Sequence, residues 1–189
     1  FYARSQEFEL NAYVDAEFAA RLRSRKSVTG FTIRLGKQAV FDWCSSSQPI
    51  IAKSSTEAEL LALSDKSDLI SVFRQFLGEI RLLPPRPTLV NMTEWEMQRH
   101  KDGDAAANIY QDNTSAITII QDVVYNGRTK HIDVRLKRLR EMVRDGVLLL
   151  RHLGTKLMLA DAFTKGLLPV DHLRLMLPIL NGGMPNQEE

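Results

Sequence analysis

Four carboxylates stand where predicted strands and helices end or begin. Asp15 follows the segment FELNAYV, Asp112 follows ANIYQ, Asp161 lies in LADAFTKGL, and Glu59 lies near the start of a long helical pattern. If the fold gathers them, their repulsion destabilises the protein unless hard divalent cations with oxygen ligands neutralise it. Such a cluster suits two-metal hydrolysis of phosphodiesters. On position alone, a single one of the four is more often a solvated surface residue.

Hydrophobic periodicity predicts the elements that would position these residues in the first half of the chain. FELNAYV alternates with period two, which indicates a half-buried strand leading into Asp15. GFTIRLG has the same period and AVFDW follows a short turn, so a three-strand meander is expected. KSSTEAELLAL then begins a helix that can run to about Ile80, with apolar residues at helical spacing.

The second half alternates strands and helices after a polar connection or insertion at residues 84–108. We expect a strand ending at Asp112, a short helix at TSAITIIQDV, a helix from about His131 to Arg144, the strand VLLLRHL, and a closing helix around Asp161. This order predicts an α/β fold in which helices cover a mixed sheet. The predicted domain spans residues 1–177, and residues 178–189 form a polar tail that should not pack.

Composition limits the class of protein. With 189 residues, 44% hydrophobic and 25% charged, one folded domain is expected and global disorder is excluded. The single cysteine, Cys44, excludes an intrachain disulfide and a cysteine-based zinc cluster and favours a reducing compartment. No apolar run is long enough to span a bilayer, so no membrane association is expected. The chain does not begin with Met, and we expect a piece of a longer product.

The small formal charge of +2 conceals an uneven distribution. Residues 125–175 hold 11 Lys and Arg against 5 Asp and Glu, whereas the rest of the chain holds 14 against 18. Basic residues there could bind nucleic-acid phosphates without sequence preference. For Lys137, Arg140 and Arg144, an ordinary charged outer helix face is an equally good interpretation. A second basic run lies between the first two predicted strands, at Arg21, Arg23, Arg25 and Lys26.

Six strings, in order along the chain, carry a family resemblance. They are YVDAEFA, RKSVTGF, SSTEAELLALS, YQDNTSAI, RTKHIDVR and LADAFTKGL. Together they resemble the ribonuclease H domain of copia-type retrotransposon polyproteins. The resemblance covers nearly the whole chain except residues 84–108 and the tail, and SSTEAE and RTKHID are its most specific motifs.

The resemblance implies a ribonuclease H-like fold, a five-stranded mixed sheet flanked by helices. It also implies cleavage of the RNA strand of RNA–DNA hybrids with two Mg²⁺ ions, with Mn²⁺ as an alternative. Asp15, Glu59, Asp112 and Asp161 match the family's catalytic, metal-binding acids. Substrate contacts are expected at Arg128, Lys130, His131, Arg25 and Lys26.

Helix geometry separates the two neighbouring glutamates. Residues two apart on a helix lie about 200° apart, so only one of Glu57 and Glu59 can face the site. The family resemblance, with its Glu followed by an aliphatic pair and Ala, implies that this residue is Glu59, and the capping-box spacing of Ser54 and Glu57 gives Glu57 another role. For His131, a substrate contact and a structural role at a helix start both stay open. His152 ends an apolar strand, which favours packing over chemistry.

The function predicted from these observations is hydrolysis of the RNA strand of hybrids during retrotransposon reverse transcription. The expected partners are the RNA–DNA hybrid and the reverse transcriptase domain of the same polyprotein. The expected location is intracellular, in virus-like particles in the cytoplasm. A nuclear phase is compatible with this expectation. The alternative is a non-catalytic hybrid-binding or assembly module that keeps the fold without turnover.

Overall fold

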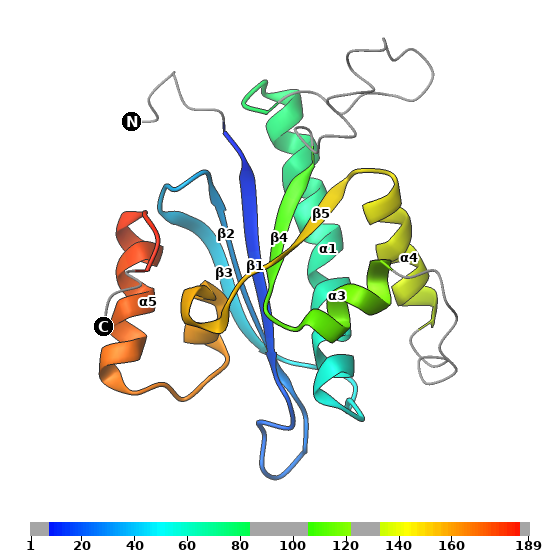
Figure 1. Cartoon of the computed structure of the whole chain (residues 1–189), viewed down its shortest axis with the longest axis vertical. Helices are drawn as coiled ribbons and strands as arrows, with labels where there is room; N and C mark the ends of the chain where they lie inside the picture. Colours follow the sequence, from blue (N-terminus) through cyan, green and yellow to red (C-terminus); the bar gives the residue numbers. More distant parts are fainter. Residues whose placement is uncertain (1–7, 84–105, 122–132, 186–189) are drawn as a thin grey trace.

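The computed structural model describes residues 8–83, 106–121 and 133–185. Five strands form one sheet in the order β3-β2-β1-β4-β5 (Figure 1). The first three strands are antiparallel neighbours, whereas β4 pairs parallel to β1 and β5 pairs parallel to β4. The bounds are β1 Leu10–Glu17, β2 Val28–Leu35, β3 Val40–Ser47, β4 Ala107–Gln111 and β5 Leu148–His152. The predicted three-strand meander and mixed sheet are therefore confirmed.

Helices cover both faces of the sheet. On one face, apolar residues of β1, β2, β4 and β5 pack in a single core against α1 (Ser55–Glu79), α3 (Thr114–Gln121) and α4 (Asp133–Arg144). On the other face, Tyr13 packs in a second core with the 3-10 helix η3 (Leu159–Phe163) and with α5 (Pro169–Asn181). This arrangement confirms the predicted ribonuclease H-like α/β fold, and Figure 1 shows the two groups of helices on opposite sides of β1.

The two-sided cover corrects one prediction about β1. Alternation in FELNAYV predicts a half-buried strand, but β1 is buried along both faces from Leu10 to Ala16. Its alternate residues Tyr13 and Asp15 face η3 and α5 instead of solvent, and the buried Asn11 hydrogen-bonds to the Gly36 carbonyl and to Asn108. The strand also continues through Asp15 to Glu17, so Asp15 lies within the strand rather than after it.

The C-terminal region differs from the predicted closing helix and tail. Around Asp161 the chain forms the five-residue 3-10 helix η3, and α5 follows as an additional helix. The predicted boundary after residue 177 falls inside α5. The helix starts with Pro169 at its first turn, where a missing N–H costs nothing, and is followed by Gly182 at φ 82°.

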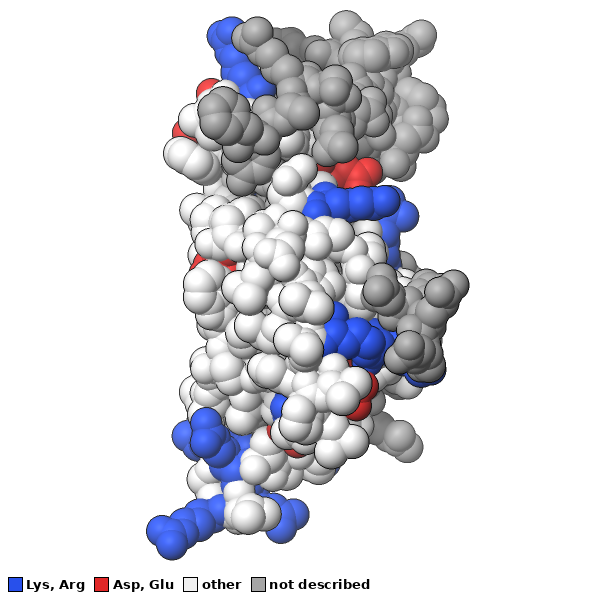
Figure 2. Space-filling model, turned by 90° about the vertical axis from the view of Figure 1, so that its left-hand side faces the viewer, with Lys and Arg blue, Asp and Glu red and all other residues white. Residues whose placement is uncertain are grey.

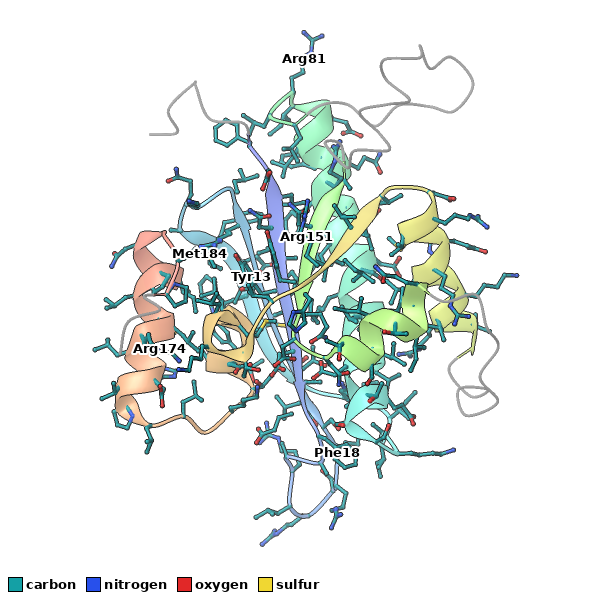
Figure 3. All side chains as sticks on the ribbon, viewed as in Figure 1. Tyr13, Phe18, Arg81, Arg151, Arg174 and Met184 are labelled. Carbon is teal, nitrogen blue, oxygen red and sulfur yellow. The ribbon has the colours of Figure 1, made fainter. Side chains whose placement is uncertain are left out.

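The segment after α5 packs because it satisfies a buried cation. Arg34 is almost fully buried, and its guanidinium donates to the Gly183 carbonyl and, over 2.5 Å, to the Tyr13 hydroxyl. Tyr13 Oη also lies 3.7 Å from Met184 Sδ, and Figure 3 shows Tyr13 and Met184 together between the sheet and α5. A buried guanidinium without such partners would be strongly destabilising, so residues to Met184 belong to the folded domain.

Gly30 brings η3 close to the sheet. Gly30 is paired with Asp15 across the β1–β2 ladder. A Cβ at Gly30 would lie 2.6 Å from both the Ala160 carbonyl oxygen and Thr164 Cγ2, which is closer than van der Waals contact permits. The absence of a side chain therefore permits residues 160–164 to rest directly beside Asp15.

We expect Gly30→Ala to lower the free energy of unfolding by about 1–3 kcal/mol, because one obstructing atom is backbone and cannot rotate away. Gly154→Ala is the matched control, since a Cβ there meets nothing within 4 Å. Urea denaturation of both variants measures the difference. Equal stability of the two variants would show that η3 does not need the close approach.

Candidate functional site

The fold brings three of the four predicted carboxylates together. Asp15 comes from β1, Asp112 follows β4 directly, and Asp161 comes from η3. One carboxylate oxygen from each lies within 4.8 Å of the others. Because β1 and β4 are parallel neighbours, their carboxyl ends meet at one edge of the sheet, where sites of open α/β sheets commonly form.

Two residues after η3 contact the buried carboxylates directly. The Thr164 hydroxyl donates to Asp15 Oδ2. Lys165 Nζ lies 2.7 Å from Asp161 Oδ1 and 3.7 Å from Asp15 Oδ1. Asp15 and Asp161 are nearly inaccessible to solvent, so these contacts replace much of the hydration that the carboxylates lose on folding.

Gln111 connects Asp112 and Glu59. Its Oε1 accepts from the backbone N–H groups of Asp112 and Asn113, at 2.7 and 3.2 Å, and shapes the turn that presents Asp112. Its Nε2 donates to Glu59 Oε2 over 3.0 Å. Asp112 Oδ2 also accepts from the Thr155 hydroxyl over 2.9 Å. Fully buried Gln111 therefore fixes two predicted site residues at once.

Glu57 and Glu59 separate as helix geometry predicts. Ser54 Oγ accepts from the Glu57 N–H, and Glu57 Oε2 accepts in return from the Lys53 N–H over 3.2 Å, so Glu57 caps the helix. Glu59 faces Gln111 at the sheet edge. Glu59 is not among the three carboxylates that meet within 4.8 Å, yet it is close enough to feel the charges of Asp15 and Asp112.

Burial leaves the cluster with destabilised negative charge. Burial raises the pKa of Glu59 to about 9, and the negative charge of Asp15 adds to the rise. Burial likewise raises the pKa of Asp161 to about 7, again with a contribution from Asp15 and with Lys165 opposing it. The pKa of Asp15 is also raised by burial, against the Thr164 hydrogen bond and the Lys165 charge.

The donor set fits a hard divalent cation. All ligand atoms available in the group are carboxylate oxygens, the donors that Mg²⁺ and Mn²⁺ accept, and a cation would stabilise charges that burial penalises. Mg²⁺ binds oxygen at about 2.0–2.1 Å. Asp15, Asp112 and Asp161 could hold such an ion, and Glu59 lies beside them.

The predicted substrate contacts are only partly described. Arg128, Lys130 and His131 lie outside the described residues. Arg25 and Lys26 lie in the β1–β2 hairpin, which extends from the end of β1 that carries Asp15. Figure 2 shows Lys and Arg side chains at the lower end of the molecule, where Figure 1 places this hairpin. Arg25 is exposed and available to a ligand.

Three arginines of α4 have partners on neighbouring helices. Arg140 donates through Nε and Nη2 to the Ile119 carbonyl, at 3.2 and 2.7 Å, which joins α4 to α3. Arg135 and Arg138 form ion pairs with Asp65 and Asp68 of α1, at 2.8 and 3.7 Å. Arg140 therefore does not face outward as a free phosphate contact. Lys137 and Arg144 are exposed.

Sequence reasoning missed Thr164, Lys165, Gln111 and Thr155 as neighbours of the site. Thr164 and Lys165 follow Asp161 by three and four residues, the spacing at which helical neighbours meet, and this spacing was the available signal. For Gln111, the sequence held no signal beyond its position next to Asp112. His152 ends β5 as predicted, but its side chain is exposed, so the packing interpretation is wrong.

We expect the metal-free protein to lose stability as pH rises toward 9. A carboxyl whose pKa is raised on folding stabilises the native state below its unfolded pKa, about 4.5 for Glu, and loses this contribution up to the folded pKa, about 9 for Glu59. Glu59→Gln, unfolded thermally in EDTA, should be more stable than wild type above about pH 8, by about 1 kcal/mol or more. Its pH profile should also be flatter.

Glu79→Gln is the control, because Glu79 is an exposed residue of the same helix. A Glu59→Gln protein that is less stable than wild type at every pH, with an unchanged profile, would contradict the electrostatic account of the site.

No protein-family model matches this chain. The retrovirus-related Pol polyprotein from transposon TNT 1-94 of Nicotiana tabacum is 33% identical over 156 residues, 82% of the chain. The corresponding polyprotein from transposon RE1 of Arabidopsis thaliana is 28% identical over 167 residues, 88% of the chain. Among solved structures, RNase H1 from the halophilic archaeon Halobacterium salinarum NRC-1 aligns with a TM-score of 0.44 and 12% identity, covering 78% of this chain and 86% of that one.

The chain spans only 10% of the length of either polyprotein. The matched segment nevertheless includes most of the chain. By sequence, the chain is therefore a homologue of one segment of the retrovirus-related Pol polyproteins of plant transposons.

Proposed function

We propose that this chain is a metal-dependent ribonuclease H that hydrolyses the RNA strand of RNA–DNA hybrids. The observation that carries the proposal is the convergence of Asp15, Asp112 and Asp161 within 4.8 Å at the sheet edge. Three buried or half-buried carboxylates repel one another and destabilise the fold. A bound cation would offset this repulsion. Glu59, held by Gln111, would complete the ligand set.

The residues of the site would divide the work between holding and orienting. Asp15, Asp112, Asp161 and Glu59 would hold two Mg²⁺ ions, or Mn²⁺, which when bound supply Lewis acidity for phosphodiester hydrolysis. The Thr164 hydroxyl fixes the rotation of the Asp15 carboxylate. Gln111 fixes Asp112 and Glu59 relative to each other, and such supporting hydrogen bonds tune metal sites.

The β1–β2 hairpin is the described surface best placed to bind the hybrid. Arg21, Arg23, Arg25 and Lys26 lie in the loop that leaves β1 just after Asp15 and Glu17. Contacts of Lys and Arg with phosphates would give affinity that depends on salt and not on sequence. The hairpin would thereby hold the duplex backbone beside the carboxylates.

The relatives support a polyprotein setting. Both plant relatives are retrovirus-related Pol polyproteins, so the chain would act within a copia-type element, beside a reverse transcriptase domain of the same polyprotein. It would remove RNA from hybrids within virus-like particles in the cytoplasm. A nuclear phase is compatible with this proposal. No helix among the described residues combines the length and the apolarity needed to cross a membrane.

The decisive assay uses a labelled RNA–DNA hybrid with Mg²⁺. We expect cleavage of the RNA strand alone, and a loss of at least about 100-fold in Asp15→Asn and Asp161→Asn, since even changes behind metal ligands cost 10–100-fold. Asp145→Asn is the control and should keep wild-type activity, because Asp145 follows α4 directly and pairs with Arg144, not with the cluster. RNA–RNA and DNA–DNA duplexes should stay intact.

The same assay tests the alternative, a non-catalytic hybrid-binding module. Hybrid binding by wild type and Asp15→Asn without cleavage by either would refute the enzyme and support that module. Cleavage that survives Asp15→Asn would place the chemistry elsewhere.

Substitution of the hairpin tests the substrate surface. We expect Arg25→Gln and Lys26→Gln each to weaken hybrid binding, and each to reduce the slope of log affinity against log salt by about 1, the value for one lost phosphate contact. Arg81→Gln is the control, because Arg81 is exposed at the opposite end of the molecule from the hairpin (Figure 3). An unchanged slope in both hairpin variants, measured by fluorescence anisotropy, would exclude this surface.

A further inference from the structure

Lys165 is the cation that the described site already contains. Its ammonium lies 2.7 Å from Asp161 Oδ1 and 3.7 Å from Asp15 Oδ1. We propose that Lys165 is a tethered counter-ion that shares these two carboxylates with a divalent cation and must move aside when that cation binds. The proposal deepens the proposed function and rests on it.

The backbone directs Lys165 onto the carboxylates. The Lys165 N–H donates to the Asp161 carbonyl over 3.0 Å, which closes a turn of five residues and places the Lys165 side chain beside the Asp161 carboxylate. Thr164, one residue earlier, donates to Asp15 Oδ2, while Lys165 faces Asp15 Oδ1. Two consecutive residues therefore engage the two oxygens of one carboxylate.

Burial makes this ion pair more consequential than a surface pair. The side chains of Asp15 and Asp161 are 1% and 5% exposed. Removal of Lys165 would leave two poorly hydrated carboxylates facing each other and Asp112. In the metal-free protein, the Lys165 ammonium offsets part of the repulsion that a divalent cation would otherwise have to offset.

The carboxylate oxygens of Asp15 and Asp161 cannot bind the Lys165 ammonium and a divalent cation equally well at the same time. Asp15 and Asp161 are two of the three carboxylates that could hold an ion, and Lys165 lies on both. A divalent cation bound there would repel the ammonium. The Lys165 side chain is 31% exposed, so it can turn toward solvent when it leaves the carboxylates.

Competition has a reciprocal consequence. If Lys165 opposes the divalent cation, the cation must weaken the hold of the carboxylates on Lys165 by the same factor. A residue with a purely structural role would not raise the affinity for metal when it is removed. An increase in affinity is therefore the signature of the proposed role.

The first experiment titrates Mn²⁺ into the metal-free chain by isothermal titration calorimetry. Lys165→Met should bind Mn²⁺ about tenfold more tightly than wild type, because an opposite charge this close shifts the proton affinity of a carboxylate by about tenfold or more. Lys165→Arg, which keeps the charge, should stay near the wild-type affinity. Lys37→Met is the matched control: Lys37 is exposed in the β2–β3 turn, beside the Leu10 end of β1.

The second experiment needs no substitution at Lys165 and remains decisive if Lys165→Met fails to fold. Wild-type protein is acetylated briefly with and without Mg²⁺, and the modified lysines are quantified by mass spectrometry. Acetylation of Lys165 should rise several-fold with Mg²⁺, whereas that of Lys37 should not change. Equal acetylation of Lys165 in both conditions would overturn the proposal.

The titration also separates the two proposals. Mn²⁺ binding by wild type with equal or weaker binding by Lys165→Met would overturn the counter-ion role and leave the metal-dependent function standing. Absence of Mn²⁺ binding from wild type and from Lys165→Met alike would overturn both.

Discussion

The repulsion among carboxylates at one edge of the sheet is the constraint on which the rest of the site depends. Asp15 and Asp161 are buried, Asp112 is half-buried, and Glu59 lies close enough for its pKa to be raised further by Asp15. The neighbouring side chains each offset part of this repulsion: Thr164 and Lys165 contact Asp15 and Asp161, and Gln111 binds Glu59. These contacts offset only part of the negative charge on the carboxylate oxygens. A divalent cation with oxygen ligands would stabilise the rest.

The fold assembles this environment from parts that are distant in sequence. Parallel pairing of β1 and β4 places Asp15 and Asp112 at the same edge of the sheet. The helix α1 supplies Glu59 from one face of the sheet, and η3 supplies Asp161 from the other face. The close approach of η3 depends on Gly30, and the layer that contains η3 and α5 is closed by contacts of Arg34 with Tyr13 and Gly183. The meeting of the carboxylates therefore depends also on residues that are not part of the cluster, such as Gly30 beside Asp15.

Local sequence patterns predict much of this and fail where contacts are long-range. Period-two alternation locates β1, and helix geometry with the capping box separates Glu57 from Glu59. The same alternation suggests solvent on one face of β1, because the cover comes from η3 and α5, more than 140 residues later. The polar composition of the C-terminal segment gives no sign that Gly183 and Met184 pack. They pack because they contact the buried Arg34, which is distant in sequence. The spacing of Lys165 from Asp161 is a local signal, but its contact with Asp15 is long-range and depends on η3 lying beside β1.

Asp15, Asp112, Asp161 and Glu59 are proposed to form a divalent-cation site. The most direct measurement is anomalous diffraction from crystals of the chain grown with Mn²⁺ and an RNA–DNA hybrid. We expect manganese peaks within bonding distance of Asp15 and of at least one of Asp112 and Asp161, with a phosphate of the RNA strand beside them. An ordered site with the same carboxylates in place and no manganese among them would refute the divalent-cation site.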